Sequence, residues 1–246
     1  MQPSLKPQPL AYLMRYHRDL FVDPLFWTSC HLDLVGCRFE LLKSMEYTQD
    51  NDQAQDGQQT REWADFGHGP VLLPPPPPSH PERLAQSCTP LVKLSSLYHI
   101  LEYEGSVLEE RCKKGPKFYF AGQAIHRPKY VVFGRRKEPN QFPDEAFRMF
   151  IGYFDYTHAI YGRKDKFQVK SHPGSGNNMP VGRLHEKRLA QITLANWKED
   201  PYFVRILLTI AQLQERSLVS KQHTTHTSRL FMAKWQDSEF IYLYEA

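Results

Sequence analysis

The chain has 246 residues, of which 41% are hydrophobic and 13% aromatic, so it can bury a sizeable core. Its N-terminus lacks the apolar run of a signal peptide, and no segment has the length and hydropathy of a membrane span, which argues against an exported or membrane-embedded protein. Four scattered cysteines favour reduced thiols over a disulfide framework. The sequence therefore predicts a cytoplasmic or nuclear protein with no membrane partner.

Charge is divided unevenly along the chain, although the net charge is only +4. Residues 117–246 carry 20 Lys and Arg against 12 Asp and Glu, whereas residues 1–116 carry 11 against 15. A basic C-terminal half suits an anionic partner, either nucleic acid or an acidic protein, and an ordinary solvated surface has the same composition.

The N-terminal third divides into a helical segment and a long connection. Asp23 and Pro24 form a helix-start signal, and apolar residues at helical spacing follow, which predicts a helix near 24–46. Residues 48–69 contain no aliphatic side chain larger than alanine, which predicts a disordered loop. Prolines 74–78 predict a polyproline II spacer, with docking to an aromatic groove of a partner as the alternative. Segment 1–47 is expected to pack with residues 83–246 as one domain, leaving 48–82 outside it.

The middle of the chain combines one helix, two strands and a second helix. Apolar spacing predicts a helix near 91–104, with Gly105 ending it and an acidic, solvated face. Aromatic and β-branched runs predict strands near 117–122 and 129–134, which we expect to pair with each other. The sequence Pro143-Asp144-Glu145 and the aromatic stripe after it predict an amphipathic helix near 143–161.

The C-terminal third contains the strongest structural signal. Asp200 and Pro201 introduce an almost wholly apolar run, which predicts a buried helix near 200–214 with a narrow wet edge at Arg205, Thr209 and Gln212. A helix near 183–197 precedes it. Strands near 228–235 and 239–244, joined by a short turn, predict a hairpin packed beside the buried helix. The expected fold class is α+β, with helices packed on small antiparallel sheets.

The runs RILLTIAQLQ, SRLFMAKW and EFIYLYEA resemble a group of uncharacterised proteins from filamentous fungi. In that group a buried helix ending in Ala-Gln is followed by a two-stranded unit ending in a Tyr-Leu-Tyr-like run. The resemblance covers about half of the chain and implies structural elements only. It assigns no activity and no catalytic residue.

Familiar catalytic patterns are absent from the sequence. We find no acidic residue followed by Glu-x-Lys on a strand, no phosphate-binding glycine loop and no nucleophile elbow. The histidines lack the ligand spacing of a zinc site, so we predict no metal and no cofactor. A divergent enzyme working through imidazole and carboxylate groups is the alternative function, and its candidate residues are His158, His185, His223, His226 and Asp155.

The leading hypothesis is a non-enzymatic interaction protein whose basic surface binds an acidic partner. Lysines and arginines cluster after the second predicted strand, around residues 163–170 and on the helix near 183–197, with Tyr130, Phe133 and Tyr161 available for stacking. The candidate anion-binding residues are Arg135, Arg136, Lys137, Arg163, Lys164, Lys166, Lys170, Arg183, Lys187 and Arg188.

Overall fold

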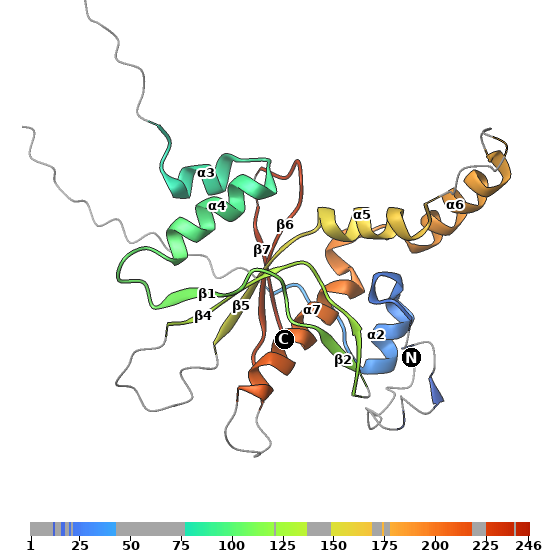
Figure 1. Cartoon of the computed structure of the whole chain (residues 1–246), viewed down its shortest axis with the longest axis horizontal. Coiled ribbons are helices and arrows are strands. Elements are labelled where there is room, and N and C mark those ends of the chain that lie inside the picture. The colour runs from blue at the N-terminus through green and yellow to red at the C-terminus, as the bar shows by residue number, and fades with distance from the viewer. Residues whose placement is uncertain are drawn as a thin grey trace, which may run out of the picture. The chain divides into compact units, whose positions relative to one another are not determined.

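The computed structural model describes residues 12, 16, 17, 20, 22–42, 77–120, 122–136, 149–168, 174, 178–217, 225–238 and 240–246. Contacts divide the chain into one compact unit of residues 1–38 and 79–246 and another of residues 39–78. The first unit contains the helices and strands named below, and its fold class is α+β, as predicted (Figure 1). None of the described helices is both long enough and apolar enough to cross a bilayer.

A mixed five-stranded sheet forms the centre of the first unit. Its strands, in spatial order, are β1 (Leu108–Cys112), β4 (Val131–Arg135), β5 (Phe150–Asp155), β6 (Arg229–Ala233) and β7 (Tyr242–Glu245). Only the β5–β6 pair is parallel, and its crossover carries α5 (Thr157–Lys166), α6 (Met179–Ile192), the 3-10 turn η4 (Trp197–Glu199) and α7 (Pro201–Arg216). The predicted hairpin near the C-terminus is confirmed as β6–β7.

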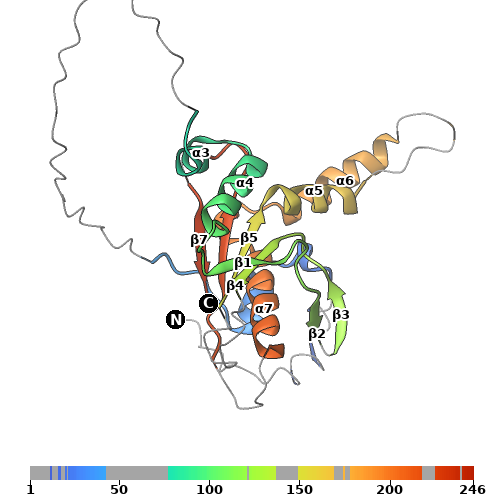
Figure 2. The ribbon, with the colours of Figure 1, turned by 60° about the vertical axis from the view of Figure 1, so that its left-hand side comes forward.

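Both faces of the sheet are covered. Helix α7 packs against one face, where the Phe154 and Phe203 rings meet and a Cβ on Gly152 would lie 2.9 Å from Ile210 Cδ1. Helix α4 (Pro90–Leu101), preceded by α3 (His80–Gln86), covers the other face, where Leu97 joins a cluster of β4, β5 and β6 side chains. Figure 2 shows these two layers on opposite sides of the strands. Strand β5 is therefore buried on both faces.

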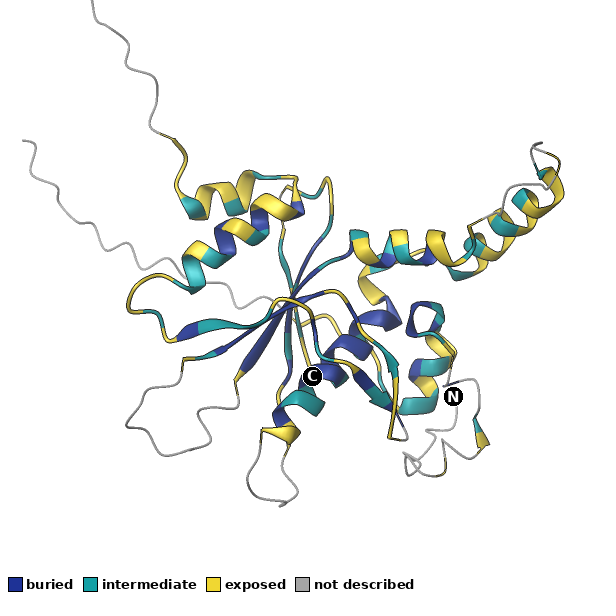
Figure 3. Ribbon diagram, in the orientation of Figure 1, coloured by how far each residue is buried: buried dark blue, intermediate teal, exposed yellow. Residues whose placement is uncertain are grey.

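Helix α7 begins as the sequence predicts. The Asp200 carboxylate accepts a hydrogen bond from Tyr202 N at 2.9 Å, and Pro201 occupies the first turn. The helix is the most deeply buried in Figure 3. The expected wet edge is wrong at Arg205 and Thr209, which are both 0% exposed, whereas Gln212 is partly exposed and its side chain bonds the Tyr119 backbone.

A further layer covers the side of α7 that faces away from the sheet. It consists of the hairpin β2 (Phe118–Phe120) and β3 (Gln123–His126), together with the 3-10 turn η2 (Pro24–Phe26) and α2 (Ser29–Val35). The guanidinium carbon of Arg205 lies 3.4 Å from the ring centroid of Trp27 and 4.1 Å from that of Phe118. These aromatic rings bury the edge that local polarity had assigned to solvent.

Several local predictions are wrong. The segment predicted as a helix near 143–161 is strand β5 followed by α5, and residues 143–148 lie outside the described residues. The runs near 117–122 and 129–134 do not pair with each other, because β2 pairs with β3 while β4 lies between β1 and β5. Strand β1 was not predicted at all. Of the helix predicted near 24–46, the described part contains η2 and α2 with residues 37–42 irregular, and residues 43–46 lie outside the described residues.

Other predictions agree with the structure or cannot be compared with it. The helices near 91–104 and 183–197 correspond to α4 and α6, the latter beginning and ending four to five residues earlier. The predicted loop at 48–69 and prolines 74–76 lie outside the described residues. The four cysteines, all within the described residues, form no disulfide with one another.

Candidate functional site

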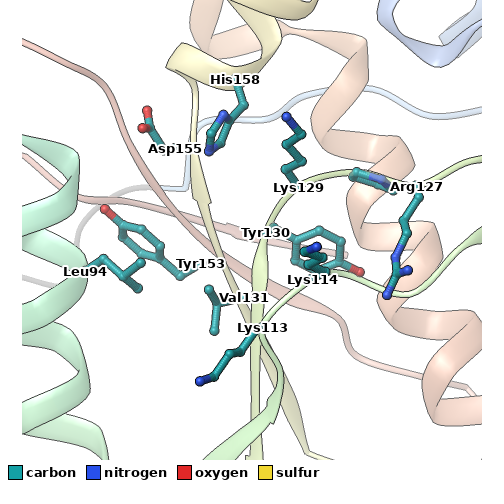
Figure 4. A pocket seen from close by; sticks show the side chains of 11 residues that line it. Leu94, Lys113, Lys114, Arg127, Lys129, Tyr130, Val131, Tyr153, Asp155 and His158 are labelled. Atoms are coloured by element: carbon teal, nitrogen blue, oxygen red, sulfur yellow. The ribbon is translucent and has the colours of Figure 1, made fainter.

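A concave pocket of about 510 Å³ lies at one end of the sheet, where β1 and β5 end and β4 begins. Because β4 is antiparallel to both neighbours, these three strand ends meet at one place. Helix α5 starts there as well, directly after β5. Figure 4 shows the lining side chains, which are Leu94, Lys113, Lys114, Arg127, Pro128, Lys129, Tyr130, Val131, Tyr153, Asp155 and His158. We call this set the basic pocket.

The charge of the basic pocket is strongly positive. Four Lys and Arg side chains line it together with a single carboxylate, that of Asp155. Lys113, Lys114 and Lys129 are exposed, and within the described part of the chain none of them forms an ion pair or a side-chain hydrogen bond. Their charges are therefore not neutralised by the described residues and remain available to an anion.

The two basic loops of the pocket are joined to each other. Arg127 Nε donates a hydrogen bond of 3.0 Å to the carbonyl oxygen of Gly115, which connects the segment after β1 to the segment before β4. Pro128 and Tyr130 are buried between them. This contact holds the lysines of both loops around the same cavity.

Tyr130 lines the pocket, but its hydroxyl oxygen is buried out of reach of the cavity. Its side chain is only 3% exposed, and its hydroxyl has no hydrogen-bond partner among the described residues. Burial raises the pKa of Tyr130 well above its ordinary value, so the hydroxyl is a neutral donor at physiological pH. Because the oxygen is closed off, this hydroxyl is not a donor for a ligand in the pocket.

Of the five candidate catalytic residues, the structure brings two together. Asp155 and His158 line the basic pocket (Figure 4), where Asp155 Oδ1 accepts a hydrogen bond from Thr157 N at 2.8 Å. No hydrogen bond joins Asp155 to His158. His185 bonds the carbonyl of Phe167 and His226 contacts Glu215, both away from the pocket, and His223 lies outside the described residues.

The predicted anion-binding residues do not form one surface. The prediction that Arg163 binds an external anion is wrong. Arg163 is 5% exposed, and its guanidinium forms hydrogen bonds of 2.6 and 2.8 Å with the buried Asp200 carboxylate. Lys166 pairs with Asp23 at 2.8 Å, and Arg136 lies 3.9 Å from Glu109. Arg163 therefore stabilises the fold, and carboxylates already compensate the charges of Lys166 and Arg136.

The other predicted basic residues are scattered. Arg135 ends β4 at the opposite end from the pocket. Lys164, Arg183, Lys187 and Arg188 are exposed on α5 and α6. Lys137 and Lys170 lie outside the described residues.

Sequence reasoning missed the lysines and the arginine that do converge. Arg127 and Lys129 lie at the start of a predicted strand, so their basic side chains could have been recognised from the sequence as a candidate site. Lys113 and Lys114 follow a strand that was not predicted, and they belong to the half of the chain that appeared acidic by composition. Only the β1–β4 pairing brings them to Lys129.

Neither a metal centre nor a known relative guides the assignment of this site. The described residues contain no group of three or more His, Cys, Asp or Glu side chains placed to hold a metal ion. Comparison of the chain with protein-family models, with curated proteins and with solved structures finds no match. The chemistry of the pocket itself therefore carries the functional argument.

Proposed function

We propose that this protein binds nucleic acid by holding phosphate groups in the basic pocket. The observation that carries the proposal is that Lys113, Lys114 and Lys129, from two separate loops, line one cavity, and none of them has a carboxylate partner among the described residues. Lysines that neutralise phosphates release condensed counterions, and this release favours binding.

The remaining groups of the pocket suit a nucleotide better than a simple anion. Arg127 is a further donor for phosphate oxygens, because only its Nε is used in the contact with Gly115. Leu94, Val131 and Tyr153 provide apolar wall, which a sugar or base can cover and which an inorganic phosphate leaves bare. An acidic protein segment is the other anionic partner expected from the sequence. It carries the negative charge but has no sugar or base to cover the apolar wall.

A binding titration with matched variants tests the proposal. Fluorescence anisotropy of a labelled oligonucleotide is measured for the wild type and for the double variant Lys113→Ala/Lys114→Ala, at about 50 and 200 mM salt. The wild type should lose affinity steeply with salt. Each phosphate contact on a single strand contributes about 0.7 to the slope of log K against log salt concentration. If both lysines contact phosphates, the double variant should therefore lower that slope by about 1.4.

The double variant Arg38→Ala/Arg83→Ala is the charge-matched control, because both arginines are exposed and lie outside the pocket. It should bind as the wild type does. Equal losses in the two double variants would show a nonspecific effect of net charge and would contradict the proposal. Competition by polyglutamate as strong as that by unlabelled oligonucleotide would favour an acidic protein as the partner.

A second candidate function is an enzyme that uses Asp155 and His158, because these are the two predicted catalytic groups that share the pocket. A histidine beside bound phosphate can act as a general acid or base. Hydrolysis of the labelled oligonucleotide by the wild type, and its loss in His158→Gln with binding retained, would support this function. If the oligonucleotide stays intact after long incubation, the enzyme function is ruled out and only the binding function remains.

A further inference from the structure

Helix α5 leads directly out of the basic pocket and carries an exposed aromatic ring. His158, in its first turn, lines the pocket, and Tyr161 follows three residues later. Residues three apart on a helix are neighbours on one face, so the Tyr161 ring is the next side chain along the helix from the pocket rim. It is 53% exposed.

A lysine accompanies this ring. Lys164 comes another three residues along the helix, next to Tyr161, and its Nζ lies 5.8 Å from the centroid of that ring. Lys164 is itself exposed and forms no ion pair within the described part of the chain. Imidazole, phenol and ammonium groups thus follow one another along α5 from the pocket, each beside the one before it.

This order matches what an unpaired nucleotide strand offers. Phosphates alternate with bases along the strand, so phosphates held at Lys113, Lys114 and Lys129 would place a neighbouring base at the rim. Bases stack on aromatic side chains only when their faces are free, and in a duplex those faces are covered by the adjacent base pairs. An aromatic platform beside a phosphate site therefore selects single strands.

We infer that the ligand of the basic pocket is single-stranded nucleic acid and that Tyr161 is the stacking platform for a base next to the bound phosphates. The inference rests on the proposed function and makes Tyr161 a residue that determines specificity. Lys164 supports it by adding a positive charge beside the ring.

The test compares single-stranded and duplex oligonucleotides of about 12 nucleotides, within the range of site sizes known for single-strand binders. The wild type should bind the single strand more tightly than the duplex of the same sequence. Tyr161→Ala should weaken single-strand binding at least about fivefold and leave duplex binding unchanged. Tyr161→Phe keeps the ring and should restore single-strand affinity to within about twofold of the wild type.

Tyr103→Ala is the matched control, since Tyr103 is also exposed, at 61%, and lies between α4 and β1, away from the pocket. It should not change binding. Circular dichroism and thermal unfolding confirm that each variant is folded.

Two failures can be told apart. If Lys113→Ala/Lys114→Ala weakens binding while Tyr161→Ala does not, or if the duplex binds as tightly as the single strand, the stacking inference is wrong and the proposed function stands. If neither oligonucleotide binds the wild type, the proposed function itself is wrong.

Discussion

The ring of Tyr130 lies directly over the backbone of Gly115, so closely that a Cβ at Gly115 would come 2.0 Å from Tyr130 Cε1. No side chain fits in that space. Gly115 follows Lys113 and Lys114, and Tyr130 follows Lys129, so this one contact brings together the two loops that make the pocket basic.

Replacing Gly115 by alanine should therefore disturb both stability and binding. The added methyl group must displace a buried ring, and overpacking of this kind costs about 1–3 kcal/mol of unfolding free energy. Gly182→Ala is the control, because nothing lies within 4 Å of a Cβ there and alanine in helix α6 should stabilise by about 0.5–1 kcal/mol. Chemical denaturation of the two variants measures the difference, and an equal effect of both would contradict the packing described.

Two pocket tyrosines should respond in opposite ways to removal of the hydroxyl. Tyr130 has no hydrogen-bond partner in the described structure, whereas Tyr153 donates to the carbonyl oxygen of Pro90 at 3.0 Å. We expect Tyr130→Phe to keep or raise stability, and Tyr153→Phe to lower it by about 1 kcal/mol. Chemical denaturation measures both variants, and a loss of stability in Tyr130→Phe as large as that in Tyr153→Phe would contradict the difference in partners.

Two buried arginines should also differ when each is replaced by methionine. Burial disfavours the charged form of Arg163, but the Asp200 carboxylate outweighs this effect and raises the pKa of Arg163. Arg163→Met leaves Asp200 buried without its counterion, which should cost about 3–5 kcal/mol.

Arg205 has no carboxylate partner among the described residues. Burial lowers its pKa to about 9, it donates one hydrogen bond, to Leu20 O at 3.1 Å, and it stacks between Trp27 and Phe118. Arg205→Met should change stability by less than about 2 kcal/mol, since the lost cation–π contact is offset by removing a buried charge. Thermal and denaturant unfolding of both variants decide this, and a larger loss in Arg205→Met than in Arg163→Met would overturn it.

His126 should make the protein less stable in mild acid. Its Nε2 lies 2.8 Å from the Tyr202 hydroxyl, and burial, together with the charges of Arg205 and Lys166, lowers its pKa below 6.5 although Asp23 acts in the opposite direction. The unfolded chain therefore takes up a proton before the folded one does, so stability falls as the pH drops through about 6.5.

The pH dependence can be assigned by substitution. His126→Gln should flatten the dependence of unfolding free energy between about pH 7 and 5, where one proton contributes at most about 1.4 kcal/mol per pH unit. Asp23 does not interfere, since its pKa is lowered from 3.8 and its effect falls at more acid pH. A variant with the slope of the wild type would exclude His126 as the cause.

The α+β class, helix α7 and the β6–β7 hairpin were predictable because their signals are local. The cap at Asp200 acts within two residues, and the turn between β6 and β7 joins neighbouring strands. The aromatic run before α5 was wrongly predicted as a helix, because its local pattern does not identify it as a strand. Strand β5 is buried on both faces, so its side chains carry no alternation that would distinguish it from a helix.

The sequence by itself determined where α7 begins, which residues are apolar enough to form a core, and that the C-terminal half carries an excess of positive charge. Only the tertiary structure decided which charges meet. It turned Arg163 and Arg205 inward and gathered Lys113, Lys114 and Lys129 at one end of the sheet. The physical reason is that a cap or a turn depends on a few adjacent residues. A strand end, by contrast, acquires its neighbours from pairing between segments far apart in the chain, as β1 does with β4.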